Sequence, residues 1–163
     1  MEKPVLDACC GARLFWHDRK DTRAVFCDIR DVDRHEYYPG RFLEVKPDVV
    51  CDFSALPFPD GSFAHVVFDP PHLSNAGPKS WMAAKYGRLD ANWPQMIRDG
   101  HRECMRVLMD YGTLIFKWSE VQIPLRDVLA AIGEKPLYGH RVGRQNKTHW
   151  MAFIKMPKEE DDA

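Results

Sequence analysis

The sequence has little net charge, no long apolar run and no leader pattern in its first residues. Its 163 residues carry a formal net charge of −1, which excludes the strong overall field of a highly basic nucleic-acid-binding protein. No apolar run approaches the roughly 18 residues that a membrane-spanning helix needs. The first residues, MEKPVLDACCG, do not pass from charged to apolar as a secretory signal does, so we expect no signal peptide. Any basic recognition surface must therefore be local.

Cysteine occurs five times, and neither its number nor its spacing suggests a disulfide framework or a metal site. The count is odd, no CxxC pair is present, and no paired His and Cys spacing matches a zinc site. Cysteines in or beside apolar runs usually act as small buried hydrophobic residues. We therefore expect free thiols, no bound metal and a reducing compartment, the cytoplasm. The five are Cys9, Cys10, Cys27, Cys51 and Cys104.

The chain does contain enough apolar material for one folded domain. Hydrophobic residues make up 45% of it and aromatic residues 12%, which are proportions typical of a globular protein with a core. This length suits one domain rather than two. We expect a single domain over residues 1–157, followed by a solvated, disordered acidic tail, KEEDDA, over residues 158–163.

Four apolar runs in the first half of the chain each contain an acid at or near their end. The runs span residues 4–11, 23–30, 48–58 and 63–71. They are continuous rather than alternating, which favours strands covered on both faces, as in a parallel sheet. The carboxyl ends of such strands form the usual ligand-binding edge. The four acids at this predicted edge are Asp7, Asp28, Asp52 and Asp69.

The second half adds helices and a closing hairpin. Apolar residues recur at helical spacing over 93–108 and again over 124–133. A fifth strand is predicted over 113–119, and two strand-like pieces, 136–142 and 148–156, flank the polar turn GRQNK. The pattern predicts an α/β domain with a mostly parallel, seven-stranded sheet, helices on both faces and a closing antiparallel hairpin.

With these elements in place, residues 4 to about 156 resemble a class I S-adenosylmethionine-dependent methyltransferase with a Rossmann-like fold. LDACCG resembles the family's acidic, glycine-containing loop beneath the cofactor, although Cys9 stands where the first glycine is usual. The resemblance implies S-adenosyl-L-methionine as cofactor and S-adenosyl-L-homocysteine as product. The cofactor-binding residues that it implies are Asp7, Ala8, Cys9, Gly11, Asp28, Ile29, Asp52, Phe53 and Asp69.

These residue types also suit the cofactor chemically. A carboxylate accepts two hydrogen bonds at once, so Asp28 can bridge the two ribose hydroxyls. Asp52 can accept from an adenine amino group, with Phe53 as an apolar face beside the ring. Gly11 permits a close approach of the backbone to the methionine end.

The segment DPPH at 69–72 resembles the D-P-P-Y motif of methyltransferases that modify exocyclic amines of nucleobases. The Asp69 carboxylate and the Pro70 carbonyl can accept the two N–H groups of such an amine and free its lone pair for methyl transfer, and proline fixes the carbonyl's direction. We expect Asp69, Pro70, Pro71 and His72 to form the catalytic segment. His72 replaces the family's aromatic residue and can either stack on the base or accept a proton.

Basic and aromatic residues near this segment indicate the substrate side. They occur in the long connection 72–92, at the end of the fifth strand and in the closing hairpin. Local basic patches of this kind suit phosphate groups. The predicted substrate-binding residues are Lys79, Trp81, Lys85, Tyr86, Lys117, Trp118, Arg141 and Arg144.

The function predicted on these grounds is N-methylation of a nucleobase amine in RNA or DNA. One alternative is a methyltransferase for a small molecule or a protein, and another is a non-catalytic cofactor-binding subunit. We expect no separate recognition domain, so a partner subunit or a homodimer is an expected source of additional recognition.

Overall fold

The computed structural model describes residues 2–77, 80–140 and 147–157. Three predicted substrate residues, Lys79, Arg141 and Arg144, lie outside these ranges, as does the tail over 158–163. The side chain of Trp81 also falls outside what is described.

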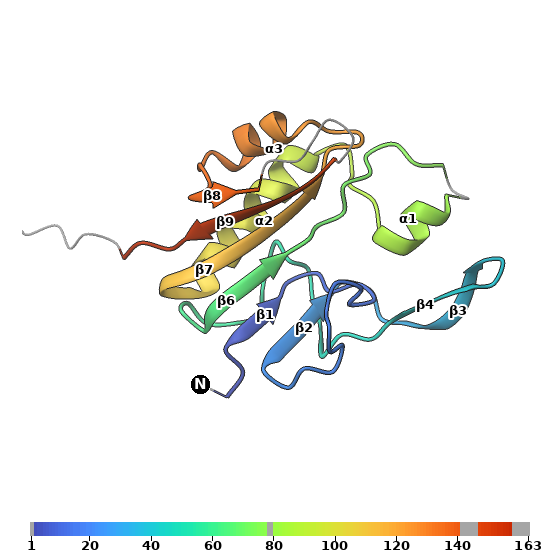
Figure 1. Ribbon diagram of the computed structural model, residues 1–163, viewed down its shortest axis with the longest axis horizontal. Coiled ribbons are helices and arrows are strands. Elements are labelled where there is room, and N and C mark those ends of the chain that lie inside the picture. The colour runs from blue at the N-terminus through green and yellow to red at the C-terminus, as the bar shows by residue number, and fades with distance from the viewer. Residues whose placement is uncertain (1, 78–79, 141–146, 158–163) are drawn as a thin grey trace, which may run out of the picture.

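A seven-stranded sheet forms the centre of the molecule (Figure 1), in the order β5-β2-β1-β6-β7-β9-β8. Neighbouring strands from β5 to β7 are parallel, whereas β9 is antiparallel to both β7 and β8. The predicted mostly parallel sheet with a closing antiparallel hairpin is therefore confirmed. The strands are β1 (Val5–Asp7), β2 (Ala24–Asp28), β5 (Val49–Val50), β6 (Phe63–Phe68), β7 (Leu108–Ser119), β8 (Tyr138–Gly139) and β9 (Thr148–Ile154).

The strand order reverses direction at β1, and this places the strand-end acids along one edge. From β1 the chain proceeds outward through β2 to β5, and it then returns to β6 on the other side of β1. Asp7 is level with Val67 of β6 and Phe26 of β2 in the parallel register. The ends of β1, β2 and β6 therefore meet at the switch point, where ligands bind in open α/β sheets.

Within the described ranges, three helices follow β6: α1 (Trp81–Tyr86), α2 (Trp93–Val107) and α3 (Leu125–Ile132). The buried stripe of α2, which includes Ile97, Cys104 and Val107, packs on the sheet, and α3 packs beside α2. A glycine in α2 permits this close approach: a Cβ at Gly100 would lie 2.6 Å from the ring of Phe53. This packing creates the main apolar core on one side of the sheet.

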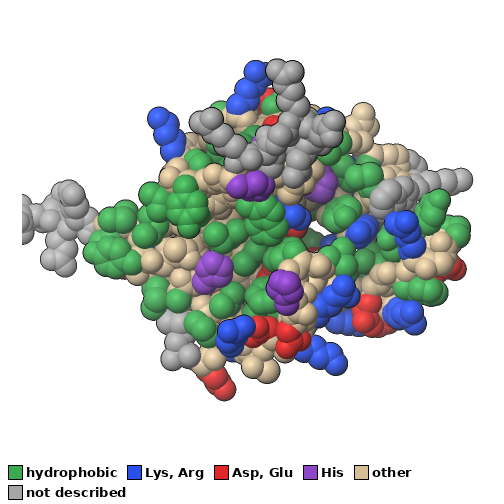
Figure 2. All heavy atoms as spheres, in the orientation of Figure 1, with side chains coloured by type: hydrophobic (Ala, Val, Ile, Leu, Met, Phe, Trp, Pro, Cys, Tyr) green, Lys and Arg blue, Asp and Glu red, His purple; other side chains and the backbone are tan. Residues whose placement is uncertain are grey.

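The opposite face carries no comparable helix within the described ranges, although we expected helices on both faces. Both longer helices lie behind the sheet in Figure 1, and the connection 8–23 forms turns across part of the front. Trp16 packs edge-on against Phe26 there, with ring centroids 4.8 Å apart. Hydrophobic side chains remain visible over much of this face in Figure 2. The physical reason is that residues 11–23, GARLFWHDRKDTR, lack a helical apolar stripe.

The part of the chain that connects β2 to β5 forms a separate two-stranded antiparallel sheet, which was not predicted. It consists of β3 (Val32–Tyr38) and β4 (Arg41–Val45), joined by a tight turn at Pro39 and Gly40. Gly40 has φ of 73°, a left-handed conformation that favours glycine. This hairpin projects beyond the edge of the main sheet (Figure 1).

No helix in the described part of the chain has the length and apolar character needed to cross a membrane.

Candidate functional site

Three of the four strand-end acids line one pocket at the carboxyl edge of the sheet. Asp28, Asp52 and Asp69 surround a cavity of about 260 Å³, here called the Asp52 pocket. Predicted residues Cys9, Ile29, Phe53 and Pro71 share its wall. The remaining lining residues are Arg30, Tyr86, Gly87, Arg88 and Met96.

A second pocket adjoins the first and is bounded by Lys117. This Lys117 pocket encloses about 170 Å³ and shares Cys9, Arg30, Asp69 and Tyr86 with the Asp52 pocket. Because Asp69 lines both, the two pockets meet at the DPPH segment. The other residues of the Lys117 pocket are Cys10, Gly11, Ala12, Leu14, Phe15 and Lys85.

The Asp28 carboxylate ties together the connections after β1 and β2. Its Oδ2 accepts from the Gly11 backbone N–H at 2.8 Å, and its Oδ1 accepts from the Arg30 backbone N–H at 2.9 Å. Gly11 has φ of 50°, so the turn uses the left-handed freedom of glycine. Asp28 therefore fixes the loop that contains Gly11 beside the Asp52 pocket.

Arg30 is the functional candidate that sequence reasoning missed. Its guanidinium pairs with Asp28, with Nε 3.0 Å from Oδ1, and its Nη1 lies 3.4 Å from the carbonyls of Ala84 and Lys85. Arg30 thus links the end of β2 to α1 across both pockets. A ribose whose two hydroxyls both donate to the Asp28 carboxylate has to replace part of the contact between Asp28 and Arg30. The spacing DIR, an acid followed two residues later by arginine, is the signal that was present in the sequence.

Asp52 and Phe53 present a polar and an apolar group on the same wall. Asp52 Oδ1 accepts from both the backbone N–H and the hydroxyl of Ser54 at 2.8 Å. Phe53 is buried and packs edge-on against Phe68, with ring centroids 5.1 Å apart. These contacts fix both side chains before any ligand arrives.

Asp69 forms an ion pair with Lys117 across the ends of β6 and β7. Asp69 Oδ2 accepts from Lys117 Nζ at 2.5 Å. The ammonium also lies 5.6 Å from the ring centroid of Phe15 and 5.7 Å from that of Trp150. Burial raises the pKa of Asp69 above its ordinary value, and the charge of Lys117 partly opposes that rise. Lys117, a predicted substrate-binding residue, thus lies beside Asp69 in the structure.

The other members of the DPPH segment have unequal access to the pockets. Pro71 lines the Asp52 pocket, whereas Pro70 and His72 are buried and line neither pocket. The His72 ring lies 5.5 Å from the ring of Tyr86, which lines both pockets. Burial lowers the pKa of His72, and the charge of Lys117 lowers it further, so both effects favour the neutral imidazole.

Asp7 and Ala8 lie beneath the site rather than on its wall. Asp7 is fully buried, and its carboxylate accepts from Trp16 Nε1 at 2.7 Å and from the Cys9 backbone N–H at 3.3 Å. Burial raises the pKa of Asp7 to about 7, and the hydrogen bond from Trp16 opposes that rise. In this structure both residues shape the loop that carries Cys9 and Gly11.

The remaining predicted substrate residues are divided between the site and the core. Lys85 and Tyr86, at the end of α1, line the Lys117 pocket. Trp118 does not: it is fully buried beneath the helices, and its Nε1 donates to the Ile123 carbonyl at 3.0 Å. Within the described ranges no group of three or more His, Cys, Asp or Glu side chains is placed to hold a metal ion.

No protein-family model and no curated protein matches this sequence. Solved structures do match in their backbone. The PH0226 protein of Pyrococcus horikoshii OT3 aligns with a TM-score of 0.59 and 17% identity, covering 93% of this chain and 81% of its own. A SAM-dependent methyltransferase from Methanosarcina mazei aligns with a TM-score of 0.54 and 12% identity, covering 97% and 95%.

The chain has the fold of the S-adenosylmethionine-dependent methyltransferases. A further example is the 1,6-didemethyltoxoflavin-N1-methyltransferase of Burkholderia thailandensis, solved with 1,6-didemethyltoxoflavin and S-adenosylhomocysteine. It aligns with a TM-score of 0.52 and 17% identity, covering 95% of this chain and 72% of its own. Because one fold serves many activities, this fold alone does not determine the function of the chain.

Proposed function

We propose that the protein is an S-adenosylmethionine-dependent N-methyltransferase that acts on an exocyclic amine of a nucleobase in RNA or DNA. The observation that carries this proposal is the position of Asp69, followed by Pro70, where the Asp52 pocket and the Lys117 pocket meet. A cofactor in the first pocket and an acceptor in the second would meet beside that carboxylate.

The Asp52 pocket fits the cofactor by its donor and acceptor groups. Asp28 supplies the acceptor for ribose hydroxyls, Asp52 supplies one for the adenine amino group, and Phe53 supplies the apolar wall. The Burkholderia neighbour with S-adenosylhomocysteine supports this choice of cofactor. When bound, the cofactor supplies an activated methyl group, so the protein has only to place an acceptor in line with it.

Asp69 positions and activates that acceptor. In the structure its carboxylate is paired with Lys117, and the incoming amine takes over part of this contact by donating an N–H. The predicted second acceptor, the Pro70 carbonyl, belongs to a residue that lines neither pocket, so Asp69 is the acceptor that the pocket walls present to the amine. The charge of Lys117 opposes the rise in the pKa of Asp69, and burial makes the carboxylate a better acceptor for the proton released after transfer.

Tyr86 provides the aromatic face that the DPPH segment itself lacks. It lines both pockets, and His72 packs beside it from the buried side. We assign the stacking contact with the base to Tyr86 and a supporting role to His72. The lowered pKa of His72 and its position outside the pocket walls favour support over proton transfer.

A small-molecule substrate is the second candidate, because the Burkholderia neighbour acts on a free heterocycle and the chain is nearly neutral. Tritiated-methyl transfer from S-adenosylmethionine into total RNA, genomic DNA and metabolite pools, followed by nucleoside analysis, separates the two. Label in a modified nucleoside of a polymer supports the proposal. Label only in the metabolite pool contradicts it, and calorimetry without a heat of cofactor binding contradicts both candidates.

A further inference from the structure

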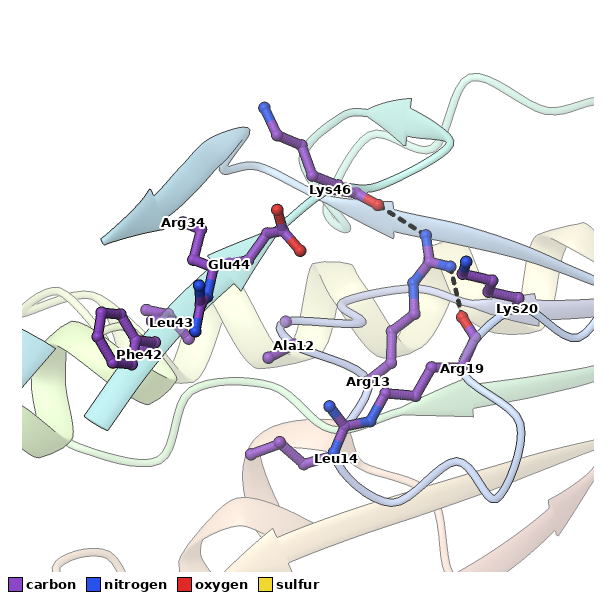
Figure 3. A pocket seen from close by; sticks show the side chains of 11 residues that line it. Ala12, Arg13, Leu14, Arg19, Lys20, Arg34, Phe42, Leu43, Glu44 and Lys46 are labelled. Carbon is purple, nitrogen blue, oxygen red and sulfur yellow. Dashed lines mark hydrogen bonds between the residues drawn. The ribbon is translucent and has the colours of Figure 1, made fainter. Parts of the chain in front are cut away.

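A wide basic cleft lies between the connection after β1 and the β3–β4 hairpin (Figure 3). It encloses about 510 Å³, and its wall contains five Lys or Arg side chains but a single acid, Glu44. We call it the basic cleft. Its lining residues are Gly11, Ala12, Arg13, Leu14, Arg19, Lys20, Arg34, Phe42, Leu43, Glu44 and Lys46.

Two of the five cations hold the walls together. Arg13 donates to the carbonyls of Arg19 and Lys46 at 2.7 Å and 2.6 Å, as Figure 3 shows, and it stacks over the Phe26 ring at 3.7 Å. Lys46 pairs with Asp31 and Asp33, each at 2.7 Å. These contacts join the loop to the hairpin, so the cleft is a fixed feature of the fold.

The other three cations, Arg19, Lys20 and Arg34, make no ion pair with any described residue. Each is exposed to solvent. Lys and Arg side chains gather on this side of the molecule in Figure 2. With Glu44 as the single acid on the wall, these cations leave a net positive charge around one concave surface, which attracts an anion with several charges on a protein whose net charge is otherwise near zero.

The basic cleft is continuous with the proposed active site. Gly11, Ala12 and Leu14 line both the basic cleft and the Lys117 pocket. An extended ligand therefore has a path from the cations of the cleft to Asp69.

The hairpin adds exposed aromatic rings beside this path. Phe42 is 53% exposed with the Arg34 guanidinium 4.3 Å above its ring, and Tyr38 is 48% exposed with Arg41 at 5.7 Å. Exposed aromatic rings among cations are typical of surfaces that bind single-stranded nucleic acid, because bases stack on the rings while phosphates meet the charges.

We propose that the basic cleft binds backbone phosphates of a single-stranded nucleic acid segment whose target base enters the Lys117 pocket. The proposal rests on the proposed function and assigns the main phosphate contacts to Arg19, Lys20 and Arg34. A base inside a duplex cannot reach a recessed carboxylate without being extruded, so an unpaired segment is the substrate form that the geometry favours.

The test uses the full chain with Arg19, Lys20 and Arg34 all changed to Gln. A matched control changes Arg102, Arg126 and Lys135, which lie on or after α2 and α3, to Gln and removes the same net charge. Binding of labelled single-stranded RNA and DNA of about 12 nucleotides is followed by fluorescence anisotropy over a range of salt concentrations. A labelled mononucleotide is measured in parallel, and cofactor binding is measured by calorimetry.

We expect the cleft variant to lose at least tenfold in affinity at low salt and the control variant to lose much less. If three phosphate contacts are lost, the slope of log affinity against log salt falls by about 2, since each contact on a single strand contributes about 0.7. Phe42→Ala should weaken strand binding without changing that slope.

Three outcomes overturn the inference: equal losses in the cleft and control variants, an unchanged salt slope, or a mononucleotide that binds as tightly as the strand. Cofactor binding should stay normal in both variants. Its absence in the wild type would instead refute the proposed function, so the two failures are distinguishable.

Discussion

Replacing Lys117 by Met should destabilise the protein in a way that depends on pH. The change keeps the length of the side chain and leaves the Asp69 carboxylate without its cation. The side chains of Lys117 and Asp69 are 22% and 19% exposed, so the pair lies between a solvent-exposed one, worth about 0–1 kcal/mol, and a buried one, whose disruption costs about 3–5 kcal/mol. We expect a loss of about 2 kcal/mol near neutral pH, which is about 4–8 °C in Tm for a domain of this size.

The sign of the pH dependence follows from Asp69. Its pKa in the folded protein is already raised, and removal of Lys117 raises it further. A raised carboxyl pKa lowers stability as pH rises from the unfolded value of about 4 through the folded value. The deficit of Lys117→Met should therefore be larger at about pH 8 than at about pH 5, because a raised pKa favours protonation of Asp69 in the variant as pH falls.

Urea denaturation of four proteins measures this effect: wild type, Lys117→Met, Asp69→Asn and the double variant. Lys135→Met serves as a control that removes one positive charge far from Asp69. The double variant should recover much of the loss, because it leaves no unpaired charge. A deficit that is the same at both pH values, or strictly additive single effects, would refute the coupling.

Three further predictions concern the site and its support. Asp69→Asn should bind cofactor nearly normally yet lose about 10²-fold or more in turnover, measured by methyl transfer, because its amide presents an N–H where an acceptor is needed; wild-type turnover would contradict the amine mechanism. His72→Phe should retain much of the rate with an unchanged pH profile, whereas Tyr86→Ala should raise KM strongly; a rate that depends on titration of His72 would contradict its supporting role. Gly100→Ala should destabilise the fold by about 1–3 kcal/mol and weaken cofactor binding, because the new methyl group displaces the ring of Phe53; normal calorimetry and Tm would show that the ring moves freely.

The main sheet was predictable because its strands are continuous apolar runs, and parallel strands bring their carboxyl ends to one edge. That single rule is enough to place Asp28, Asp52 and Asp69 together from the sequence. The side of the sheet on which each residue packs was harder to predict. Tryptophan is a residue type that can line a pocket or pack in a core, and only the position of the covering helices places Trp118 in the core.

The β3–β4 hairpin and Arg30 were missed for different reasons. Most of β3 is exposed, so its sequence, VDRHEYY, lacks the apolar pattern that identifies a half-buried strand. Arg30 contacts carbonyls 54 and 55 residues away, and such a contact leaves no periodic signal in the chain. The predicted helices on both faces failed because alternation of strands and connections indicates a layered fold without specifying what fills each layer.

The one-sided placement of α2 and α3 has a consequence for how such a protein can change. The main apolar core lies under these helices, whereas the basic cleft and the hairpin belong to connections on the opposite side and at the end of the sheet. The sheet therefore separates the main apolar core from the residues of the basic cleft, whereas the Asp52 pocket, lined by Phe53 and Met96, borders that core. Substitutions, insertions or deletions in the hairpin can alter substrate preference at little cost in folding free energy. This scaffold is consequently well suited to divergence in specificity, and also to directed replacement of its hairpin by design.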